Sequence, residues 1–534
     1  MQDAPVPASG RRLPAVPDRV WPLAVFVVAA VWFLYRNDRP GVWTDEGVTL
    51  VVLHRTPTQL WRLWHGNDAT MMPYYLLMKA LRALSDAVGG PVSDVVLLRS
   101  VSGLAMAGAA AALYALVRRR SGVALGLVTA LTFVAMPGAL RYGQEARPYA
   151  LMMLASAVTW LAWDVNRERR SWAVRGVYVA AVVFGSLMHL FLLMQLAAQV
   201  AAALVADWRQ GARHPRDARQ TRATLVPLVI GGVIVGLPLA YIALHGHGVP
   251  DYVPMSVAKV IDTMAETILN THLGLAGPLL LVAAVGVVAL AVLNRDVLFV
   301  LLSWFAIPFV LQAAAGFVQP NTVRLRYWMA LATPLGALVG AGVFGVATQL
   351  ARGLGRALRR DAASPVVRRV TAGLAAAGVA LTVVWMVPDN TYIRGNAGHG
   401  PVGATAGVMR ILDATPHQPL LLVDSRFNGY AFAGYGLEYV VDNPYATPNP
   451  DSSYAWGFQR TPEEFLSALN GHDTVVFAHI VSGGSTPLTL EDTAARLAAA
   501  GFRRTRTRHS GHWTIMVYER FSAQNSSATV TPGG

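Results

Sequence analysis

The sequence predicts a mainly α-helical, polytopic membrane protein with about eleven spans, followed by a small soluble α/β domain. Hydrophobic residues make up 54% of its 534 residues and charged residues only 14%, whereas a soluble protein carries about a quarter charged residues. The apolar residues come in blocks of membrane length. After Val387 the composition changes, and short apolar runs alternate with clusters of Gly, Pro, Asn and Asp.

The net charge of +14 is concentrated in short loops between apolar blocks. This distribution is typical of membrane topology and predicts no nucleic-acid partner. The chain has no cysteine, which excludes disulfides, thiolate chemistry and cysteine-ligated metals. We find no metal-ligand spacing and no phosphate-binding Gly-rich loop, so we predict no metal and no cofactor, while a divalent ion stays open.

Residues 1–19 form a basic tail rich in Pro and Ala, and residues 20–387 form the expected membrane domain. The run from Trp172 to Ala206 is nearly continuous, but basic residues flank it on both sides. We therefore expect it to cross the membrane twice and to turn near His189. The expected spans are 20–35, 95–117, 123–140, 148–163, 172–187, 189–206, 225–244, 278–293, 297–318, 327–349 and 370–387.

Arginine and lysine are distributed unequally between the two sets of loops. The loops expected inside hold 22 of these residues, against 11 in the longer loops expected outside. The positive-inside rule then places the N-terminus in the cytoplasm and the C-terminal domain outside, as in a multi-pass protein of the bacterial plasma membrane. The polar loops around Asp45, Glu145, His189 and Arg324 all fall on the outer face.

Residues 388–520 are expected to form the extracytoplasmic α/β domain, and residues 521–534 a polar tail. The patterns predict strands at 420–423, 474–478 and 514–518, and helices at 462–470 and 491–500. Two amphipathic helices are expected in the first external loop, over 48–64 and 73–84, lying in the membrane interface.

Two adjacent carboxylates, Asp45 and Glu46, follow the first span closely. A carboxylate just outside a membrane can act as a general base on an acceptor hydroxyl. The alternative is a structural one, since Thr44 or Asp45 could cap a helix that starts near Glu46. Asp68 and Tyr74 lie further along the same loop, and we expect both at substrate-binding positions.

A second polar cluster joins the third and fourth spans in a loop of minimal length. It contains Gln144, Glu145, Arg147 and Tyr149. Such a cluster could hold a phosphate or orient a second carboxylate. Each arginine could instead act as an interface anchor, with its charge among the lipid headgroups.

Arg324, Arg326 and Tyr327 open the tenth span. Two arginines at alternate positions suit a lipid phosphate, because the guanidinium fork matches phosphate oxygens, although a pair of interface anchors is the alternative. Arg99 lies inside the second span near its outer end, where an ionisable group is a functional hypothesis. His189 could be a proton carrier, a hydrogen-bond donor or a structural histidine at a helix end.

Together these segments resemble the bacterial GT-C glycosyltransferases, nearest to the protein O-mannosyltransferase and lipid A aminoarabinose transferase group. The resemblance covers about residues 20–350 and rests on the first-loop acid pair, the run 144–149 and the run 324–327. It implies an inverting transferase that takes a sugar from a polyprenyl-phosphate donor on the outer face. The acceptor would be a hydroxyl of a glycan, a lipid or a protein.

The resemblance also implies roles for individual residues. Asp45 corresponds to the catalytic base, with Glu46 beside it. Arg324 and Arg326 correspond to the donor-phosphate ligands, and the loop that starts at Glu145 contributes to the site. Many bacterial members carry a His-Pro-Pro run after the loop acid, whereas this chain has an acid and a proline there without the histidine.

Two other functions are compatible with a polytopic membrane protein. A secondary transporter or lipid flippase would need charges near the bilayer midplane and an internal repeat. The predicted spans are nearly free of charge apart from Arg99, and the sequence shows no repeat. The alternative among enzymes is an oligosaccharide ligase that uses a diphosphate-linked donor. The sequence names neither the sugar, hexosyl or pentosyl, nor the acceptor.

Overall fold

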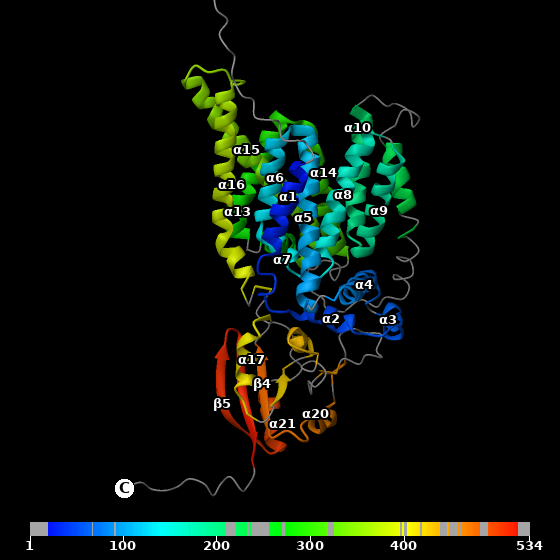
Figure 1. Cartoon of the computed structure of the whole chain (residues 1–534), viewed down its shortest axis with the longest axis vertical. Coiled ribbons are helices and arrows are strands. Elements are labelled where there is room, and N and C mark those ends of the chain that lie inside the picture. The colour runs from blue at the N-terminus through cyan, green and yellow to red at the C-terminus, as the bar shows by residue number, and fades with distance from the viewer. Residues whose placement is uncertain are drawn as a thin grey trace, which may run out of the picture.

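A computed structural model gives the fold of the chain (Figure 1). A helical bundle, a layer of short helices at one end of it, and a small sheet beyond that layer follow one another along the long axis (Figure 1). The structure describes residues 20–66, 68–89, 92–169, 171–209, 221–231, 234–235, 256–269, 273–318, 325–395, 398–399, 403–416, 419–424, 426–437, 446–447, 458–459, 461–480 and 490–521.

The predicted apolar blocks fold as helices wherever they are described, and of the block 225–244 only part is described. The turn expected near His189 is confirmed, since α9 ends just before it and α10 begins just after it. The long helices are α1 Val20–Leu34, α5 Asp94–Ser121, α6 Val123–Ala135, α8 Tyr149–Glu168, α9 Trp172–Met188, α10 Leu192–Arg209, α13 Leu273–Leu293, α14 Arg295–Val318, α15 Ala332–Ala357 and α16 Pro365–Ile393.

Within the described part of the chain five helices are long and apolar enough to cross a membrane, namely α5, α13, α14, α15 together with most of the preceding 3-10 helix η3 (Leu325–Leu331), and α16. A sixth results if α6 is joined to α7 (Pro137–Gly143), to which it is bent by 66°. The bend replaces the continuous helix expected over 123–140, because Pro137 has no N–H and Met136 before it is extended. The count of eleven spans stays a prediction.

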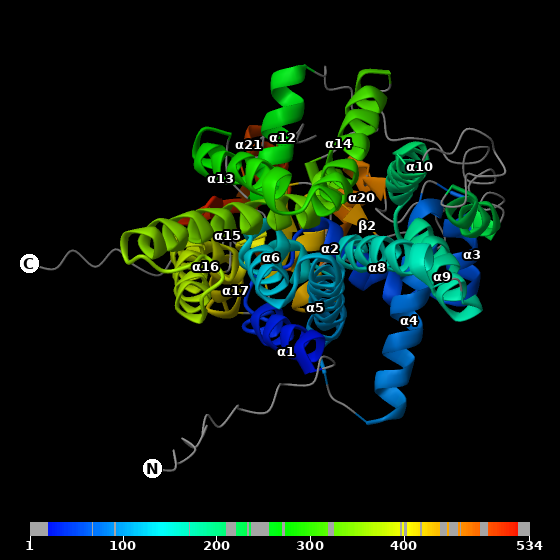
Figure 2. The ribbon, with the colours of Figure 1, turned by 90° about the horizontal axis from the view of Figure 1, so that it is seen from above.

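The bundle is organised around two long helices. α5 packs against α1, α6 and α8, whereas α15 packs against α6, α13 and α16 (Figure 2). Glycines allow α13 and α15 to approach closely, since a Cβ on Gly286 would overlap the carbonyl oxygen of Leu338 and one on Gly342 would overlap that of Val282. Small residues commonly bring helix backbones together in this way inside membranes.

Short helices lie across the end of the bundle at which α5 begins, here called the site end (Figure 1). They are α2 Thr44–Leu53, α3 Pro57–Trp64, η1 Ala69–Met71 and α4 Met72–Ala87. The expected single helix over 48–64 is wrong. Pro57 starts a new helix, which Thr56 caps by accepting a hydrogen bond from the backbone N–H of Gln59. The second expected helix, 73–84, is confirmed as α4.

The start of α2 differs from the capping alternative considered for it. Neither Thr44 nor Asp45 is the N-cap, because the helix already begins at Thr44 and the N-cap is Trp43. The backbone N–H of Trp43 donates to Oε2 of Glu46 at 3.4 Å. The side chain of Asp45 is therefore not used to cap α2.

The C-terminal part contains a four-stranded sheet with the order β1-β4-β6-β5. β1 and β4 are parallel and the other pairs antiparallel. α17 packs on one face, and α20 and α21 pack on the other. The elements are β1 Leu420–Val423, β4 Thr474–Ile480, β5 Phe502–Ser510, β6 Trp513–Arg520, α17 Ala406–Asp413, α20 Pro462–Ala468, α21 Leu490–Ala499 and a small pair, β2 Ala446–Thr447 with β3 Phe458–Gln459.

The C-terminal domain contacts the membrane domain through η5 (Tyr430–Gly434), which packs on α2 (Figure 1). A Cβ on Gly47 would overlap the carbonyl oxygen of Tyr430, so a glycine is required at this contact. α16 continues past the expected domain boundary at 387 and ends at Ile393. Soon after it, His399 is buried against the first turn of α2.

Candidate active site

Glu46 is a fully buried carboxylate with both oxygens engaged. Arg99 donates to it twice, from Nε to Oε1 at 2.9 Å and from Nη2 to Oε2 at 2.7 Å. The backbone N–H of Ala146 donates to Oε1 at 2.8 Å, and Nδ1 of His399 lies 3.4 Å from Oε2. Burial alone would raise the pKa of Glu46, but Arg99 and His399 hold it far below its usual value.

Arg99 extends this network into the chain before α2. Its guanidinium also donates to the carbonyl oxygens of Asn37, Pro40 and Gly41, at 3.0, 2.6 and 3.2 Å. The side chain is completely buried. Arg99 and Glu46 thus tie α5, the chain before α2, and the loop after α7 to one another, and this arrangement fixes the direction in which neighbouring Asp45 points.

Asp45 lies against two arginines that the sequence places far away. Nη1 of Arg326 is 2.5 Å from its Oδ2, and Nη2 of Arg147 is 3.6 Å from the same oxygen. Arg147 is also anchored on α2, since its Nη1 donates to the carbonyl oxygen of Asp45 at 3.3 Å and to Oγ1 of Thr49 at 3.4 Å. The predicted first-loop acid and late-span arginine are therefore in direct contact.

Both arginines keep donors to spare. The Nε of Arg147 and the Nε of Arg326 are buried and have no hydrogen-bond partner among the described residues. The Arg326 guanidinium also lies over the ring of Trp43, 5.4 Å from its centroid. Two arginines that meet at one carboxylate and keep unused donors could bind an anionic oxygen ligand. Arg324, predicted to act with Arg326, lies outside the described residues.

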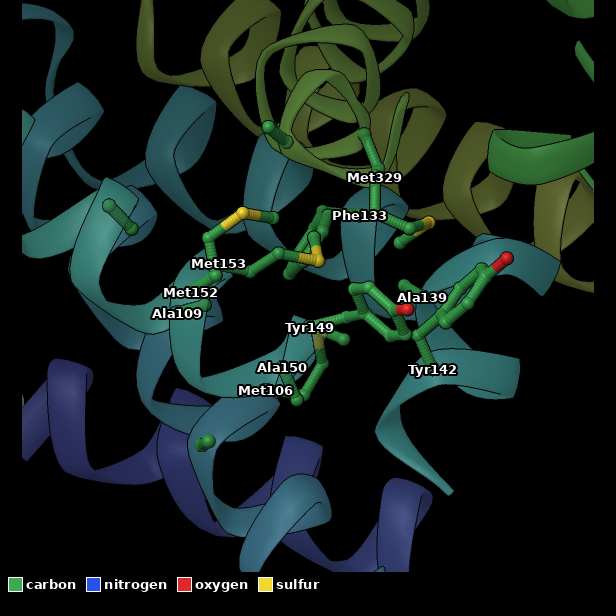
Figure 3. Close-up of a cluster of buried hydrophobic side chains, with 14 of the residues drawn as sticks. Met106, Ala109, Phe133, Ala139, Tyr142, Tyr149, Ala150, Met152, Met153 and Met329 are labelled. Atoms are coloured by element: carbon green, nitrogen blue, oxygen red, sulfur yellow. The ribbon is translucent and has the colours of Figure 1, made fainter. Parts of the chain in front are cut away.

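An aromatic wall adjoins the arginines. The ring of His189 lies 5.7 Å from Tyr149 and 5.0 Å from Tyr327, and Tyr149 lies 5.4 Å from Tyr142. Tyr142 and Tyr149 come from two successive helices, α7 and α8, and rest beside the buried methionines of the bundle (Figure 3). Among the predicted residues, Tyr149, His189 and Tyr327 are thus brought together.

Burial favours the neutral form of His189, and its hydrogen bond indicates which ring nitrogen carries the proton. Burial, reinforced by Arg326 and Arg147, lowers the pKa of His189 to about 3. The backbone N–H of Phe191 donates to Nδ1 at 3.3 Å, so the ring proton is assigned to Nε2. The bond that Nδ1 accepts and the place of His189 at the end of α9 fit the structural alternative, while Nε2–H is left as a donor. A proton carrier would have to become charged near Arg326 and Arg147.

Glu145 is as buried as Glu46 but is bonded very differently. Neither Oε1 nor Oε2 has a hydrogen-bond partner in the described part of the chain, although its carbonyl oxygen accepts a bond from Oγ of Ser102 at 2.7 Å. Burial raises the pKa of Glu145 to about 8. Arg141 opposes this shift, while the charges of Glu46 and Asp45 add to it.

The remaining predicted residues have mixed positions. Gln144 donates to the carbonyl oxygens of Phe33 and Tyr35, both at 2.9 Å, which makes it a tie to α1 and not a wall of the site. Tyr74 is buried in α4, with a hydroxyl that has no partner among the described residues. Asp68 lies near Tyr75 of α4, whose pKa is raised first by burial and then by the charge of Asp68.

Sequence reasoning missed several side chains at the site. His399 lies in a Gly-rich stretch with no periodic pattern, so nothing in the sequence links it to Glu46. Trp43 adjoins the acid pair but has no predicted role. For metals, the described ranges contain no group of three or more His, Asp or Glu side chains that could hold an ion.

Solved structures resemble the chain along most of its length. ArnT from Cupriavidus metallidurans in the apo state matches with a TM-score of 0.53 and 13% identity, over 93% of this chain and 98% of that one. The same protein bound to undecaprenyl phosphate matches with a TM-score of 0.49 and 12% identity, over 96% and 99%. Archaeal oligosaccharyltransferase AglB from Archaeoglobus fulgidus, in complex with an inhibitory peptide and a dolichol-phosphate, gives 0.40 and 15%, over 86% and 69%.

No protein-family profile and no curated protein matches the chain. At 13% identity the likeness to apo ArnT concerns the fold. It agrees with the resemblance carried by the first-loop acids, the 144–149 run and the Arg326 segment. The chain therefore shares the overall fold of ArnT.

Proposed function

We propose that this chain is an inverting glycosyltransferase that moves a sugar from a polyprenyl-phosphate donor to an acceptor hydroxyl. The observation that carries the proposal is the meeting of Arg326 and Arg147 over Asp45, with an unused Nε on each arginine. The site lies at one end of an apolar helical bundle, where the phosphate of a lipid-linked donor would be found. The fold shared with ArnT supports the same assignment.

The donor phosphate would bind Arg326 in competition with Asp45. Arg147 has further bonds to the backbone of α2 and to Thr49, so it stays in place. For Arg326 the contacts are Asp45 and the ring of Trp43. A phosphate that takes part of the Arg326 fork would therefore draw this side chain away from Asp45. The guanidinium charge would then stabilise the phosphate as it leaves the sugar.

The aromatic wall supports a sugar-binding role for the space next to these arginines. Tyr149 and Tyr327 offer ring faces, and His189 offers a neutral Nε2–H donor between them. We place the sugar, a hexose or a pentose such as mannose or aminoarabinose, against this wall. The donor's prenyl tail would extend among the spans, and the acceptor, a glycan, a lipid or a protein, would enter beneath the C-terminal domain.

Transfer with inversion requires direct attack of the acceptor oxygen on the anomeric carbon and removal of the acceptor proton by a nearby base. The carboxylates of Asp45, Glu46 and Glu145 surround the site. Glu46 is committed to Arg99 and Ala146, so we assign it to holding α2 in place. The resemblance assigns the removal of the proton to Asp45.

The proposal is tested by incubating the purified protein with synthetic polyprenyl-phosphate sugars and following release of polyprenyl phosphate by mass spectrometry. Lipid that copurifies with the protein identifies the natural carrier. Saturable donor binding with release of polyprenyl phosphate is the expected result. Absence of both with every mannosyl and aminoarabinosyl donor would exclude the proposed chemistry.

We further propose that the site faces outward from the bacterial plasma membrane. Alkaline phosphatase fused after Val387 is expected to be active, because this enzyme folds only outside the cytoplasm, and a fusion within 207–222 is expected to be inactive. The reverse pattern would place every candidate site residue in the cytoplasm and contradict an outer-face transferase.

A further inference from the structure

Polar atoms without partners accumulate around the candidate site. Among the described residues these include Oε1 and Oε2 of Glu145, the Nε atoms of Arg141, Arg147 and Arg326, and the hydroxyl of Tyr74. Oδ2 of Asp45 also lacks a hydrogen bond, but unlike Glu145 it forms ion pairs with Arg326 and Arg147. Buried polar groups are nearly always hydrogen-bonded, so each such atom in a folded protein needs an explanation. The arginine Nε atoms can donate hydrogen bonds, and the Glu145 carboxylate can accept them. A ligand with hydroxyl groups could use both.

Glu145 is the unpaired acid of the three that surround the site. Arg99 and Ala146 occupy both oxygens of Glu46, and Arg326 and Arg147 converge on Oδ2 of Asp45. A carboxyl group paired with arginines has a lowered pKa, so its carboxylate is a weaker base. Glu145 has no such ion pair in the described part of the chain, and its backbone is held in place through Ser102.

Resting on the proposed function, we propose that Glu145 is the catalytic base that takes the proton from the acceptor hydroxyl, and that Asp45 instead pairs with Arg326 and Arg147 in the free protein. In the step, the acceptor O–H proton passes to a carboxylate oxygen of Glu145 while the acceptor oxygen bonds to the anomeric carbon. The bond from that carbon to the phosphate oxygen breaks, and its electron pair leaves with the polyprenyl phosphate.

The electrostatics agree with this geometry. Burial raises the pKa of Glu145 to about 8, which is near working pH, where a general base is most effective. The donor phosphate would add another negative charge and act in the same direction. The charged and titratable groups around Glu145 are Asp45 and Glu46 on α2, Tyr74 on α4, Arg141 and Tyr142 on α7, and Arg326 on η3.

The test is the dependence of kcat on pH, with donor affinity measured separately. In the wild type, kcat is expected to rise about tenfold per pH unit up to about pH 8 and then level off, because only the ionised base is active. Glu145→Gln is expected to lower kcat by about 10²–10⁴-fold and to abolish the rise, with donor affinity within a few-fold of wild type. Glu145→Asp is expected to restore part of the rate and the pH dependence.

The Asp45→Asn variant distinguishes the role of Asp45 from that of Glu145. Removing the charge of Asp45 lowers the pKa of Glu145, so the rising limb is expected to move to lower pH while the limb itself survives. A loss of about 10²-fold or more in kcat for Asp45→Asn, with Glu145→Gln near wild type, would make Asp45 the base and overturn the proposal. A wild-type rate that falls through pH 8 would overturn it as well, since Glu145 would then act as an acid.

Misfolding is controlled by thermal unfolding at pH 7. Glu145 is ionised in the unfolded chain at this pH but mostly protonated in the folded one, so folding must take up a proton. Glu145→Gln avoids this cost and is expected to be at least as stable as the wild type. Glu168→Gln, at the opposite end of the bundle, is the matched control and is expected to leave kcat unchanged. If the wild type neither binds nor turns over donor, the proposed function fails, not this assignment.

Discussion

The helical bundle carries an arginine–carboxylate cluster at each end, and the two clusters are built differently. At the end away from the site, Asp164 is fully buried and accepts hydrogen bonds from Nε of Arg119, at 3.1 Å, and from Arg120. Arg119 also reaches Glu168 at 2.6 Å. Both oxygens of Asp164 are used, and its arginine partners are partly exposed to solvent.

At the site end, about 30 Å away along α5, the two arginines are less completely bonded. Arg147 is more deeply buried than Arg119 and Arg120, whereas Arg326 is about as exposed as Arg120. Arg147 and Arg326 keep free Nε atoms, and Glu145 has two free oxygens, among the described residues. A buried charge without partners costs free energy, so a cluster that serves only folding is expected to be complete, as the one at Asp164 is. The incomplete hydrogen bonding at the site end is therefore consistent with the ligand-binding role proposed for it.

Substitutions in the Glu46–Arg99 pair are expected to have the largest effect, and on stability, because this pair is the fully hydrogen-bonded part of the cluster at the site end. Arg99→Ala leaves a buried carboxylate without its partner, which typically costs about 3–5 kcal/mol. We expect a marked drop in the unfolding temperature in detergent and little folded protein. Replacing Glu46 and Arg99 together by methionine should recover much of this loss. A single variant as stable as the wild type would show that the pair is not structural.

Arg326→Ala tests the incomplete part of the cluster. Loss of one charge-assisted contact to phosphate costs about 1.5–3 kcal/mol, or about ten- to a hundredfold in donor affinity. Arg326→Lys should restore only part of it, because an ammonium cannot form the bidentate fork. Arg324→Ala, at the predicted companion position, should act in the same direction. Donor affinity of these variants is measured by titration. An unchanged affinity in Arg326→Ala would rule out phosphate binding by Arg326.

The sequence was sufficient for most of the membrane domain because apolar blocks of membrane length have few alternatives to a helix. It failed where one residue interrupts such a block, as Pro137 does, and where the pattern is not apolar. β5 is an edge strand whose residues are nearly all exposed, so its arginine-rich sequence gives no alternation to detect.

For the site, charges beside apolar blocks were sufficient to select Asp45, Glu145, Arg147 and Arg326. The sequence could not show which of them pair with one another. Glu46 is bonded to Arg99, 53 positions away, and contacts His399, 353 positions away. Such long-range contacts decide which acid is satisfied and which is free. The division of roles between neighbouring acids therefore depends on the fold.

Compared with Arg326→Ala, Asp45→Asn should have a smaller effect on donor binding, in the opposite direction. In the free protein Asp45 competes with a phosphate for Arg326, and the amide competes less. We expect donor affinity to increase by up to about tenfold, equivalent to about 1.4 kcal/mol. Combining Asp45→Asn with Arg326→Ala should remove the gain, since the competition no longer exists. Weaker donor binding in the single variant would mean that Asp45 holds Arg326 in its binding position instead.

Arg119→Gln should have the smallest effect and completes the comparison, because Arg326→Gln makes the same chemical change at the other end. Arg119 is partly exposed, and Asp164 keeps Arg120 as a partner. The other pair that Arg119 forms, with Glu168, is exposed, and an exposed pair contributes at most about 1 kcal/mol. We therefore expect Arg119→Gln to shift the unfolding temperature slightly and to leave donor affinity and kcat unchanged, whereas Arg326→Gln should weaken donor binding without destabilising the fold. If the two variants instead showed the same balance of lost stability and lost binding, the difference in hydrogen bonding between the two clusters would have no functional meaning.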